Sequence, residues 1–560
     1  MRNFKRILVF LLAIALIFGF AACGGKKDSA APTDAPELEP AATPQEEPAK
    51  EPGPEVEEEA TVTYPLVEET LELSIFFMSN PVVVEAMEDT RNNAAFRVAE
   101  EATGIHIVSR GVMPWVAADE FNIMIAAEEY TDFIAQFGSL YTQGYDHAIE
   151  EGVIHDLKDL IPTCAPDWLR ALDAYEDGVK ACNTEGGHMP EISSIAKVPN
   201  RVENGLWIRA DWLEKLGLDR PVTYDDLEEA LLGFKTEFGS KGILMMGTGV
   251  MGDNWLASGF GINAYQVVGF LSEYAFYQVE NEVRHGWVQP EFKDYLTLMN
   301  KWYNMGLIHP DTILMPADWN NPENDKYKTT GEVGLWYGSM SGAAAIERAS
   351  TDPDCKVAAI TDPVLKEGDI THFQLTPDNF GLGSGCCITT AVEDVEVALK
   401  WLNWWFTEEG YLAANYGEEG TTYTMVNGEP KYTELIMNDE RGAFMAWNVH
   451  CNNTTGIYGN GEKLDDIYAP NELEAVKIWM SGSDNAYRYP AAATLNAEEG
   501  SRFNQIMAEV NTYGSENIIK FIIGQRPLDE FEQFVDQLYA MEIQETIDLK
   551  QAALNRYLAR

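Results

Sequence analysis

The stretch NGLWIRADWLEKLGLDRPVTYDDLEEALLGFKTEF, residues 204–238, is the most informative part of this chain. Its apolar run LWI at 206–208 is short and contains an aromatic and a β-branched residue, which predicts a strand. A short helix is expected over 211–216. Thr223, with Asp226 three residues later, then predicts the capped start of a second helix. A strand followed by two helices indicates a chain that crosses from one α/β lobe to another.

The same residues carry a family resemblance. The string Trp207-Ile-Arg209-Ala-Asp211-Trp212-Leu213, followed by Leu216-Gly217-Leu218 and Pro221-Val-Thr223, resembles the crossover segment of bacterial extracellular solute-binding lipoproteins. Such lipoproteins are the carbohydrate-capturing components of ABC importers. Shorter matches continue in order from about residue 70 to the end of the chain, among them Gln289-Pro290-Glu291-Phe292, Trp302-Tyr303 and Asn415-Tyr416-Gly417-Glu418.

The resemblance implies an α/β fold of the two-lobe periplasmic-binding-protein type (type II), with a mostly parallel sheet flanked by helices in each lobe. It also implies a receptor without enzymatic activity or cofactor. The receptor would capture an oligosaccharide in a cleft between the lobes and deliver it to ABC permease subunits. Alternating strands and helices over 70–160 favour the same mostly parallel sheet. A chain of 560 residues is too long for one compact core, which agrees with two lobes.

The expected crossings define the domains. We expect a signal peptide over 1–22, a lipidated N-terminus and disordered tether over 23–69, lobe 1 over 70–203 and 380–435, and lobe 2 over 204–379 and 436–560. Hinge bending is expected near Glu203–Trp207 and Thr376–Asn379. Within lobe 1 the patterns predict strands over 70–78 and 105–108, helices over 84–102 and 119–127, and a later helix from Val395 that ends at Gly410.

The N-terminus has the pattern of an export signal with a lipid anchor. A basic start is followed by an apolar run over 7–20, which is too short to span a membrane comfortably. Ala21-Ala22-Cys23 then resembles a lipobox, in which Cys23 is acylated, although Phe20 replaces the usual leucine. The alternative is ordinary signal cleavage beside an incidental cysteine. The resemblance implies a protein anchored by its lipid (palmitate) to the extracellular face of the cell membrane.

Charge excludes several classes of partner. The net charge is −51, and residues 28–59 alone carry eleven Asp or Glu and seven Pro with a single Lys. Such a segment cannot bury enough apolar surface to fold, so we expect an extended tether. The acidic surface repels nucleic acids and anionic lipid headgroups, which excludes a nucleic-acid-binding role.

Candidate ligand contacts follow from the rule that open α/β sheets bind ligands beyond the carboxyl ends of their strands. In lobe 1 the rule selects Ser79, Asn80, Phe137 and Tyr141. The candidates of lobe 2 and its crossings are aromatic or amide side chains: Asn254, Trp255, Trp336, Tyr337, Asn379 and Trp447. Asn254 and Trp255 end a glycine-rich turn that could equally be a flexible loop. Arg209 could contact a ligand or form a structural ion pair with Asp211.

Other chemistries have weak signals. No nucleophile, zinc or phosphate-loop motif is present, and Glu418-Glu419 is no convincing catalytic pair because neighbours on a strand point to opposite faces. Asp318–Asp325 lacks the register of a calcium loop, so no metal is predicted. Cys164 and Cys182 could form a disulfide or remain buried free thiols. A peptide receptor on the same fold, or a secreted glycan-active enzyme, stays as an alternative.

Overall fold

The computed structural model describes most of the chain after the tether. The described residues are 60–197, 201–244, 256–264, 275–311, 322–373, 380–451, 458–459 and 465–560. The predicted signal peptide, Cys23 and most of the tether lie outside these ranges, as does 374–379 of the second crossing. Residues 59–560 form one of the two compact units of the chain.

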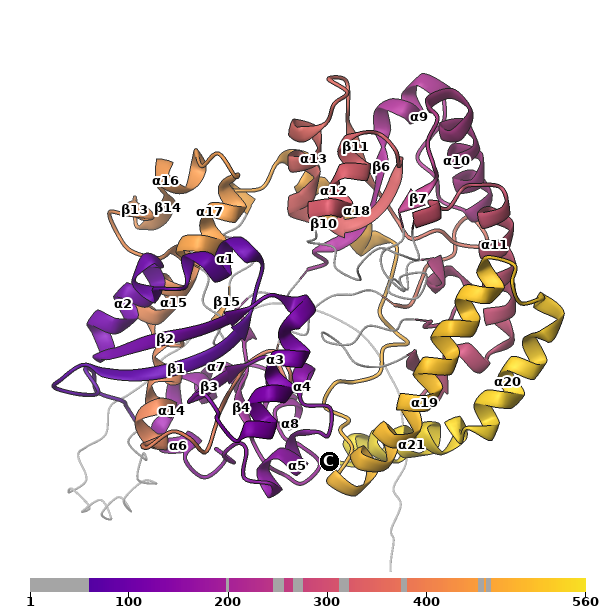
Figure 1. Ribbon diagram of the computed structural model, residues 1–560. Coiled ribbons are helices and arrows are strands. Elements are labelled where there is room, and N and C mark those ends of the chain that lie inside the picture. The colour runs from indigo at the N-terminus through magenta and orange to yellow at the C-terminus, as the bar shows by residue number, and fades with distance from the viewer. Residues whose placement is uncertain are drawn as a thin grey trace, which may run out of the picture. The chain divides into compact units, whose positions relative to one another are not determined.

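The first sheet has five strands in the order β2-β1-β3-β12-β4 (Figure 1). Its members are β1 (Leu71–Met78), β2 (Ile105–Val112), β3 (Phe133–Ala135), β12 (Cys386–Ile388) and β4 (Glu191–Ile192). The pairs β1–β2 and β1–β3 are parallel, whereas β12 runs antiparallel to both β3 and β4. A strand from beyond residue 380 therefore completes a sheet that begins at residue 71.

Alternate residues of this sheet enter two separate cores, as the pleat requires. On β1, Ile75 and Phe77 pack with α2 (Ala94–Thr103) and α14 (Val395–Trp404). Phe76, between them, packs against α3 (Pro114–Ala127) and α4 (Phe137–Leu140) on the opposite face. The sheet is thus covered by helices on both sides.

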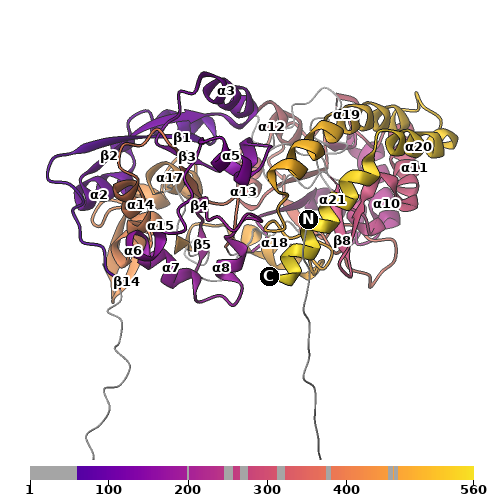
Figure 2. The same cartoon turned by 90° about the horizontal axis from the view of Figure 1, so that it is seen from below.

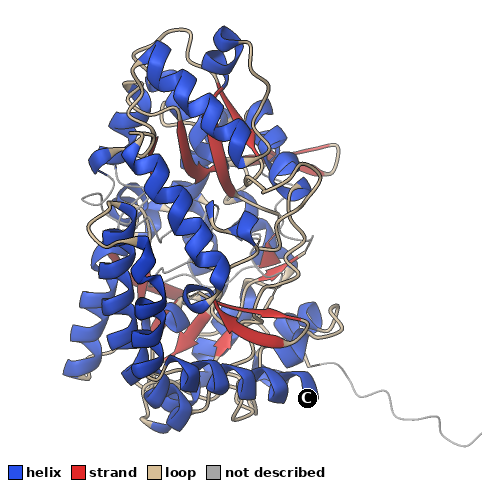
Figure 3. Ribbon diagram, turned by 90° about the vertical axis from the view of Figure 1, so that its right-hand side faces the viewer, coloured by secondary structure: helices blue, strands red, loops and turns tan. Residues whose placement is uncertain are grey.

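The second sheet has the order β11-β6-β10-β7. Its strands are β11 (Val357–Ile360), β6 (Asn204–Arg209), β10 (Leu335–Ser339) and β7 (Ile243–Leu244). One face packs on α9 (Ala210–Leu216), α10 (Tyr224–Phe238) and α11 (Pro290–Asn304), and the other on α13 (Ala343–Ala349), α17 (Ala443–His450) and α18 (Pro470–Ser481). Figure 3 shows strands flanked by helices in this part of the molecule as well.

The remaining elements are short helices, hairpins and a C-terminal helical region. The helices are α1 (Pro81–Ala86), α5 (Tyr145–Glu150), α6 (Ile161–Cys164), α7 (Pro166–Leu172), α8 (Gly178–Ala181), α12 (Pro322–Thr329), α15 (Glu408–Tyr416), α16 (Glu434–Met437), α19 (Ala497–Ile522), α20 (Phe531–Ala540) and α21 (Ile543–Ala559). The strands are β5 (Ile195–Ala196), β8 (Phe276–Val279), β9 (Glu282–His285), β13 (Tyr423–Val426), β14 (Glu429–Tyr432) and β15 (Tyr458–Gly459).

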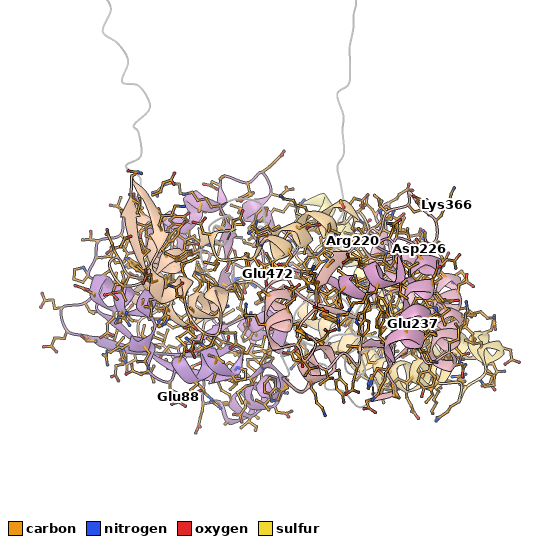
Figure 4. The ribbon with its side chains drawn as sticks, turned by 90° about the horizontal axis from the view of Figure 1, so that it is seen from above. Glu88, Arg220, Asp226, Glu237, Lys366 and Glu472 are labelled. Atoms are coloured by element: carbon orange, nitrogen blue, oxygen red, sulfur yellow. The ribbon has the colours of Figure 1, made fainter. Side chains whose placement is uncertain are left out.

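The crossing stretch folds as its sequence predicts. Thr223 Oγ1 accepts a hydrogen bond from the Asp226 backbone N–H at 3.2 Å, and the Asp226 carboxylate accepts one from the Thr223 N–H at 2.9 Å. Asp226 lies at the start of α10 (Figure 4). Gly217 and Gly239 end the two helices in the left-handed conformation, which glycine adopts without steric cost.

Several local predictions need correction. The sheets are mixed rather than mostly parallel, because β6 and β12, which follow the two crossings, run against neighbouring strands. The helix expected over 84–102 is two helices, α1 and α2, separated by a turn of 3-10 helix at Thr90–Asn92. The strand expected at 105–108 continues to Val112, and the helix after it begins at Pro114. Gly410 ends no helix and lies inside α15.

The C-terminal helices contact a loop of the first predicted lobe. Arg560 pairs with Glu185 at 2.6 Å, and Arg556 pairs with both Glu185 and Glu499 at 2.6 Å. Lys180 lies over the ring of Tyr557 at 4.4 Å, consistent with the neighbouring positions of α8 and α21 in Figure 2. Charged contacts therefore join these segments in addition to the crossings. Among the helices of the described residues, none combines the length and apolar character that crossing a membrane requires.

Candidate functional site

The carboxyl ends of three parallel strands meet at one edge of the first sheet. Beyond β1, the Ser79 N–H donates to the Val112 carbonyl of β2 at 3.1 Å, which continues the ladder past Met78. Beyond β3, the Gln136 N–H donates to Gly385 O at 2.9 Å, and Gln136 is held in the left-handed conformation with φ 56°. Ser79, Asn80 and Gln136 are all half-buried there.

Polar side chains at this edge have spare hydrogen-bonding capacity. Asn80 caps α1, since its Oδ1 accepts from the Val83 N–H at 3.1 Å. Within the described residues, the Asn80 amide nitrogen, the Ser79 hydroxyl and the Gln136 side chain make no hydrogen bond. The predicted candidates Ser79 and Asn80 therefore lie where a ligand could meet them, whereas Gln136 was missed by the sequence analysis.

The two predicted rings of lobe 1 are packed into the core. Phe137 is fully buried and stacks on Tyr141 with ring centroids 5.1 Å apart. Phe121 of α3 meets both rings edge-on. The Tyr141 hydroxyl bonds to Nδ1 of His147 at 2.8 Å, and burial raises the pKa of Tyr141 to about 12. Neither ring offers a free face in this structure, because α3 and α4 close over them.

Arg209 has the structural role that the sequence left open. Its guanidinium is fully buried. It donates hydrogen bonds from Nε and Nη2 to the Asp211 carboxylate at 2.8 Å, and from Nη2 to Asp352 at 2.7 Å. The ring of Trp212 lies 4.2 Å from Arg209 Cζ. The pKa of Asp352 is lowered, chiefly by the N–H of Asp354 and also by Arg209. This ion-pair group fixes the entry from β6 into α9.

The rings of β10 are also core residues. Trp336 is 2% exposed and packs with Trp207 and Trp479, whereas Tyr337 is 6% exposed and packs on the opposite face. Both lie inside the strand rather than beyond its end, between β6 and β7. Because both rings are buried, their exposure does not support the prediction that they stack on a sugar.

The other candidates divide into one buried ring and three undescribed residues. Trp447 of α17 is buried and donates from Nε1 to Asn415 O at 3.0 Å. Asn254, Trp255 and Asn379 lie outside the described residues. The structure thus places Ser79 and Asn80 at one sheet edge, buries the described candidates of lobe 2 and leaves Asn254, Trp255 and Asn379 undescribed.

Glu191 is a buried carboxylate close to the same edge. It lies on β4 with no exposed surface, and it accepts hydrogen bonds from Tyr145 Oη at 2.7 Å, Gly383 N–H at 2.9 Å and Gly385 N–H at 3.2 Å. Burial raises the pKa of Glu191 to about 7, against the opposing effect of these hydrogen bonds. It holds the segment that leads from the second crossing into β12.

Metal and thiol chemistry find no site in the described ranges. No group of three His, Cys, Asp or Glu side chains there could hold a metal ion, and part of the acidic stretch 318–325 lies outside them. Cys164 and Cys182 are both buried and free, so the structure has the thiol alternative rather than the disulfide. Burial raises the pKa of the Cys182 thiol to about 12.

Trp115 is the second residue that the sequence analysis missed. It follows Pro114 at the start of α3, directly after β2, and is 47% exposed. The strand was expected to end at Val108 and the next helix to begin at residue 119, so Trp115 belonged to no expected element. The pairing of β1 with β2 continues to Val112 and so places Trp115 three residues beyond a strand end.

Comparison with known proteins identifies the family. The sequence profile of bacterial extracellular solute-binding proteins matches residues 95–411, more than half of the chain. Lipoprotein LipO of Bacillus subtilis (strain 168) is 24% identical over 351 residues, 62% of this chain and 66% of LipO. The fructooligosaccharide ABC transporter substrate-binding protein FusA of Streptococcus pneumoniae is 21% identical over 534 residues, 89% of this chain and 92% of FusA.

Solved structures share the fold. The alginate-binding protein AlgQ2 superposes with a TM-score of 0.71 at 17% identity, covering 88% of this chain and 100% of AlgQ2. FusA in complex with fructo-nystose gives a TM-score of 0.70 at 18% identity, over 87% of this chain and 100% of the FusA chain. These likenesses confirm the predicted two-lobe α/β fold, with mixed sheets. The chain belongs to the family of bacterial extracellular solute-binding proteins.

Proposed function

We propose that the chain is the extracellular substrate-binding component of an ABC importer and captures an oligosaccharide between its two lobes. The observation that carries this proposal is the alignment with FusA, which covers 92% of that protein. Solved relatives are named for binding different glycans, alginate in one case and fructooligosaccharides in another. Sugar hydroxyls need hydrogen-bonding partners. Among the described residues, the Asn80 amide nitrogen, the Ser79 hydroxyl and the Gln136 side chain make no hydrogen bond, which supports a site at that edge.

Calorimetry tests this function. Purified protein is titrated with kestose, nystose, alginate oligosaccharides, high-mannose glycans and a panel of short peptides. We expect saturable binding of at least one oligosaccharide and none of the peptides. Binding of peptides alone would replace the proposal with a peptide receptor on the same fold.

No catalytic role is proposed. Members of this family are binding components of ABC transporters rather than enzymes. Incubation of the protein with each oligosaccharide of the panel is expected to release no reducing sugar, and delivery of the intact glycan to permease subunits is its proposed fate.

The proposed location is the outer face of the cell membrane, with Cys23 as the lipid-bearing residue. Replacing Cys23 by alanine is expected to release the protein from the membrane fraction and to abolish labelling with palmitate, because acyl chains supply about 0.8 kcal/mol per buried CH₂. The matched control is S29A, which changes a nearby small residue and should leave the protein membrane-bound. Retention of the Cys23 variant on membranes would contradict the anchor.

A further inference from the structure

Trp115 differs from the other tryptophans that the structure describes. Of the 14 tryptophans, Trp255 and Trp319 lie outside the described residues. The remaining tryptophans are all buried apart from Trp115, which is 47% exposed. A single exposed apolar side chain is ordinary on a protein surface. The position of Trp115, more than its exposure, points to a function.

Trp115 lies at the same edge of the sheet as polar groups that have no hydrogen-bond partner among the described residues. Met78 is paired with Val112, and the Ser79 N–H bonds to the Val112 carbonyl, so Ser79 lies next to the residue that begins the turn into α3. Gln136 lies beyond β3 on the other side of β1, since β1 pairs with both strands. Neighbouring strands are about 4.8 Å apart, so the three strand ends form one continuous edge.

This combination matches the chemistry of a sugar. One face of a pyranose or furanose ring is rich in C–H groups and packs on an aromatic face, while the hydroxyls at its rim need hydrogen bonds. Within the described residues, the exposed Trp115 ring, the Asn80 amide nitrogen, the Ser79 hydroxyl and the Gln136 amide supply both kinds of contact. The rings first expected to do so, Phe137, Tyr141 and Trp336, are buried.

We propose that Trp115 is the ring on which the first lobe stacks a sugar of the bound oligosaccharide, with Ser79, Asn80 and Gln136 binding the hydroxyls of that sugar. The inference rests on the proposed carbohydrate-binding function. It adds that Trp115 contributes to the affinity for the oligosaccharide. Trp115 belongs to the outer side of the edge, because β2 is the terminal strand of the sheet and Trp115 follows it in the first turn of α3.

Calorimetry of single variants tests the proposal with the oligosaccharide panel used above. W115A is expected to weaken binding at least about tenfold, W115F to retain part of the affinity, and Q136A to weaken it by a smaller factor. The matched control is I123A, on the same helix and 62% exposed, which should bind like the original protein. Thermal unfolding of W115A is expected to be unchanged, because an exposed ring stabilises the fold little.

Acrylamide quenching of tryptophan fluorescence gives an independent readout. Acrylamide is neutral and is therefore not repelled by a protein of net charge −51. The bound oligosaccharide is expected to protect part of the emission from quenching, and W115F should lose that protected part. Protection that persists in W115F, or W115A affinity equal to that of I123A, overturns the inference while the carbohydrate function stands. Absence of binding to every oligosaccharide overturns the proposed function and the inference together.

Discussion

Replacing Arg209 by methionine is expected to lower the free energy of unfolding by about 3–5 kcal/mol. The guanidinium is fully buried and pairs with Asp211, whose side chain is only 5% exposed, so its removal leaves a buried carboxylate without its main partner. The Trp212 ring also loses the cation that lies 4.2 Å from it. Urea unfolding followed by circular dichroism measures the change as a fall in the denaturation midpoint.

Arg220→Met is the matched control for this prediction. Arg220 pairs with Glu474 at 3.0 Å, but the two side chains are 46% and 55% exposed, and Figure 4 shows Arg220 at the surface. Exposed pairs contribute up to about 1 kcal/mol. The double variant R209M/D211N is expected to recover part of the loss, since it removes the unpaired charge. A midpoint for R209M that equals the midpoint for R220M would contradict a structural role of Arg209.

The local signals of the crossing stretch were sufficient to predict its structure. The capping box of α10 and the helix-ending Gly217 lie within residues 204–238. Both act over a few residues, so they have the same effect in an isolated segment as in the fold. Asn427 and Gly428 show the same kind of local effect: both have positive φ, as a two-residue hairpin turn of this type requires, and they join β13 to β14. Strand direction was not predictable in this way, because it depends on the path of the chain between lobes.

Burial of candidate rings is likewise a property of the tertiary packing. The sequence places Trp336 near a strand end, but nothing in it shows that β10 continues to Ser339 with neighbours on both sides. The reverse holds for Trp115, which belonged to no expected element because β2 was expected to end four residues earlier and α3 to begin at residue 119. Errors of a few residues in strand boundaries therefore led the sequence analysis to select Trp336, a core ring, and to omit Trp115, a surface ring.

Glu191→Gln is expected to reduce the loss of stability that the original protein shows between pH 5 and 8. Burial raises the pKa of Glu191 from 4.5 to about 7 in the folded state. Between these values the unfolded chain binds fewer protons at this residue than the folded protein, so the free energy of unfolding falls as pH rises. The shift predicts a loss of about 2–3 kcal/mol between pH 5 and 8. Urea midpoints measured at both pH values give the difference.

The glutamine variant keeps the contacts of Glu191, which isolates the charge. Its amide oxygen can accept from the Gly383 and Gly385 N–H groups, and its nitrogen can donate to Tyr145 Oη. The other ionisable groups near Glu191 are the buried thiols Cys182, Cys386 and Cys387, whose pKa values burial raises and which stay neutral over this range.

The control E237Q changes an exposed carboxylate of α10 (Figure 4) and should preserve the loss. Equal losses in E191Q and the original protein would show that Glu191 does not titrate in this range. A smaller loss in E191Q would show that the Glu191 carboxyl group, which holds the segment entering β12, is protonated at pH 5. It would also show that the buried negative charge of Glu191 destabilises the folded protein at pH 8.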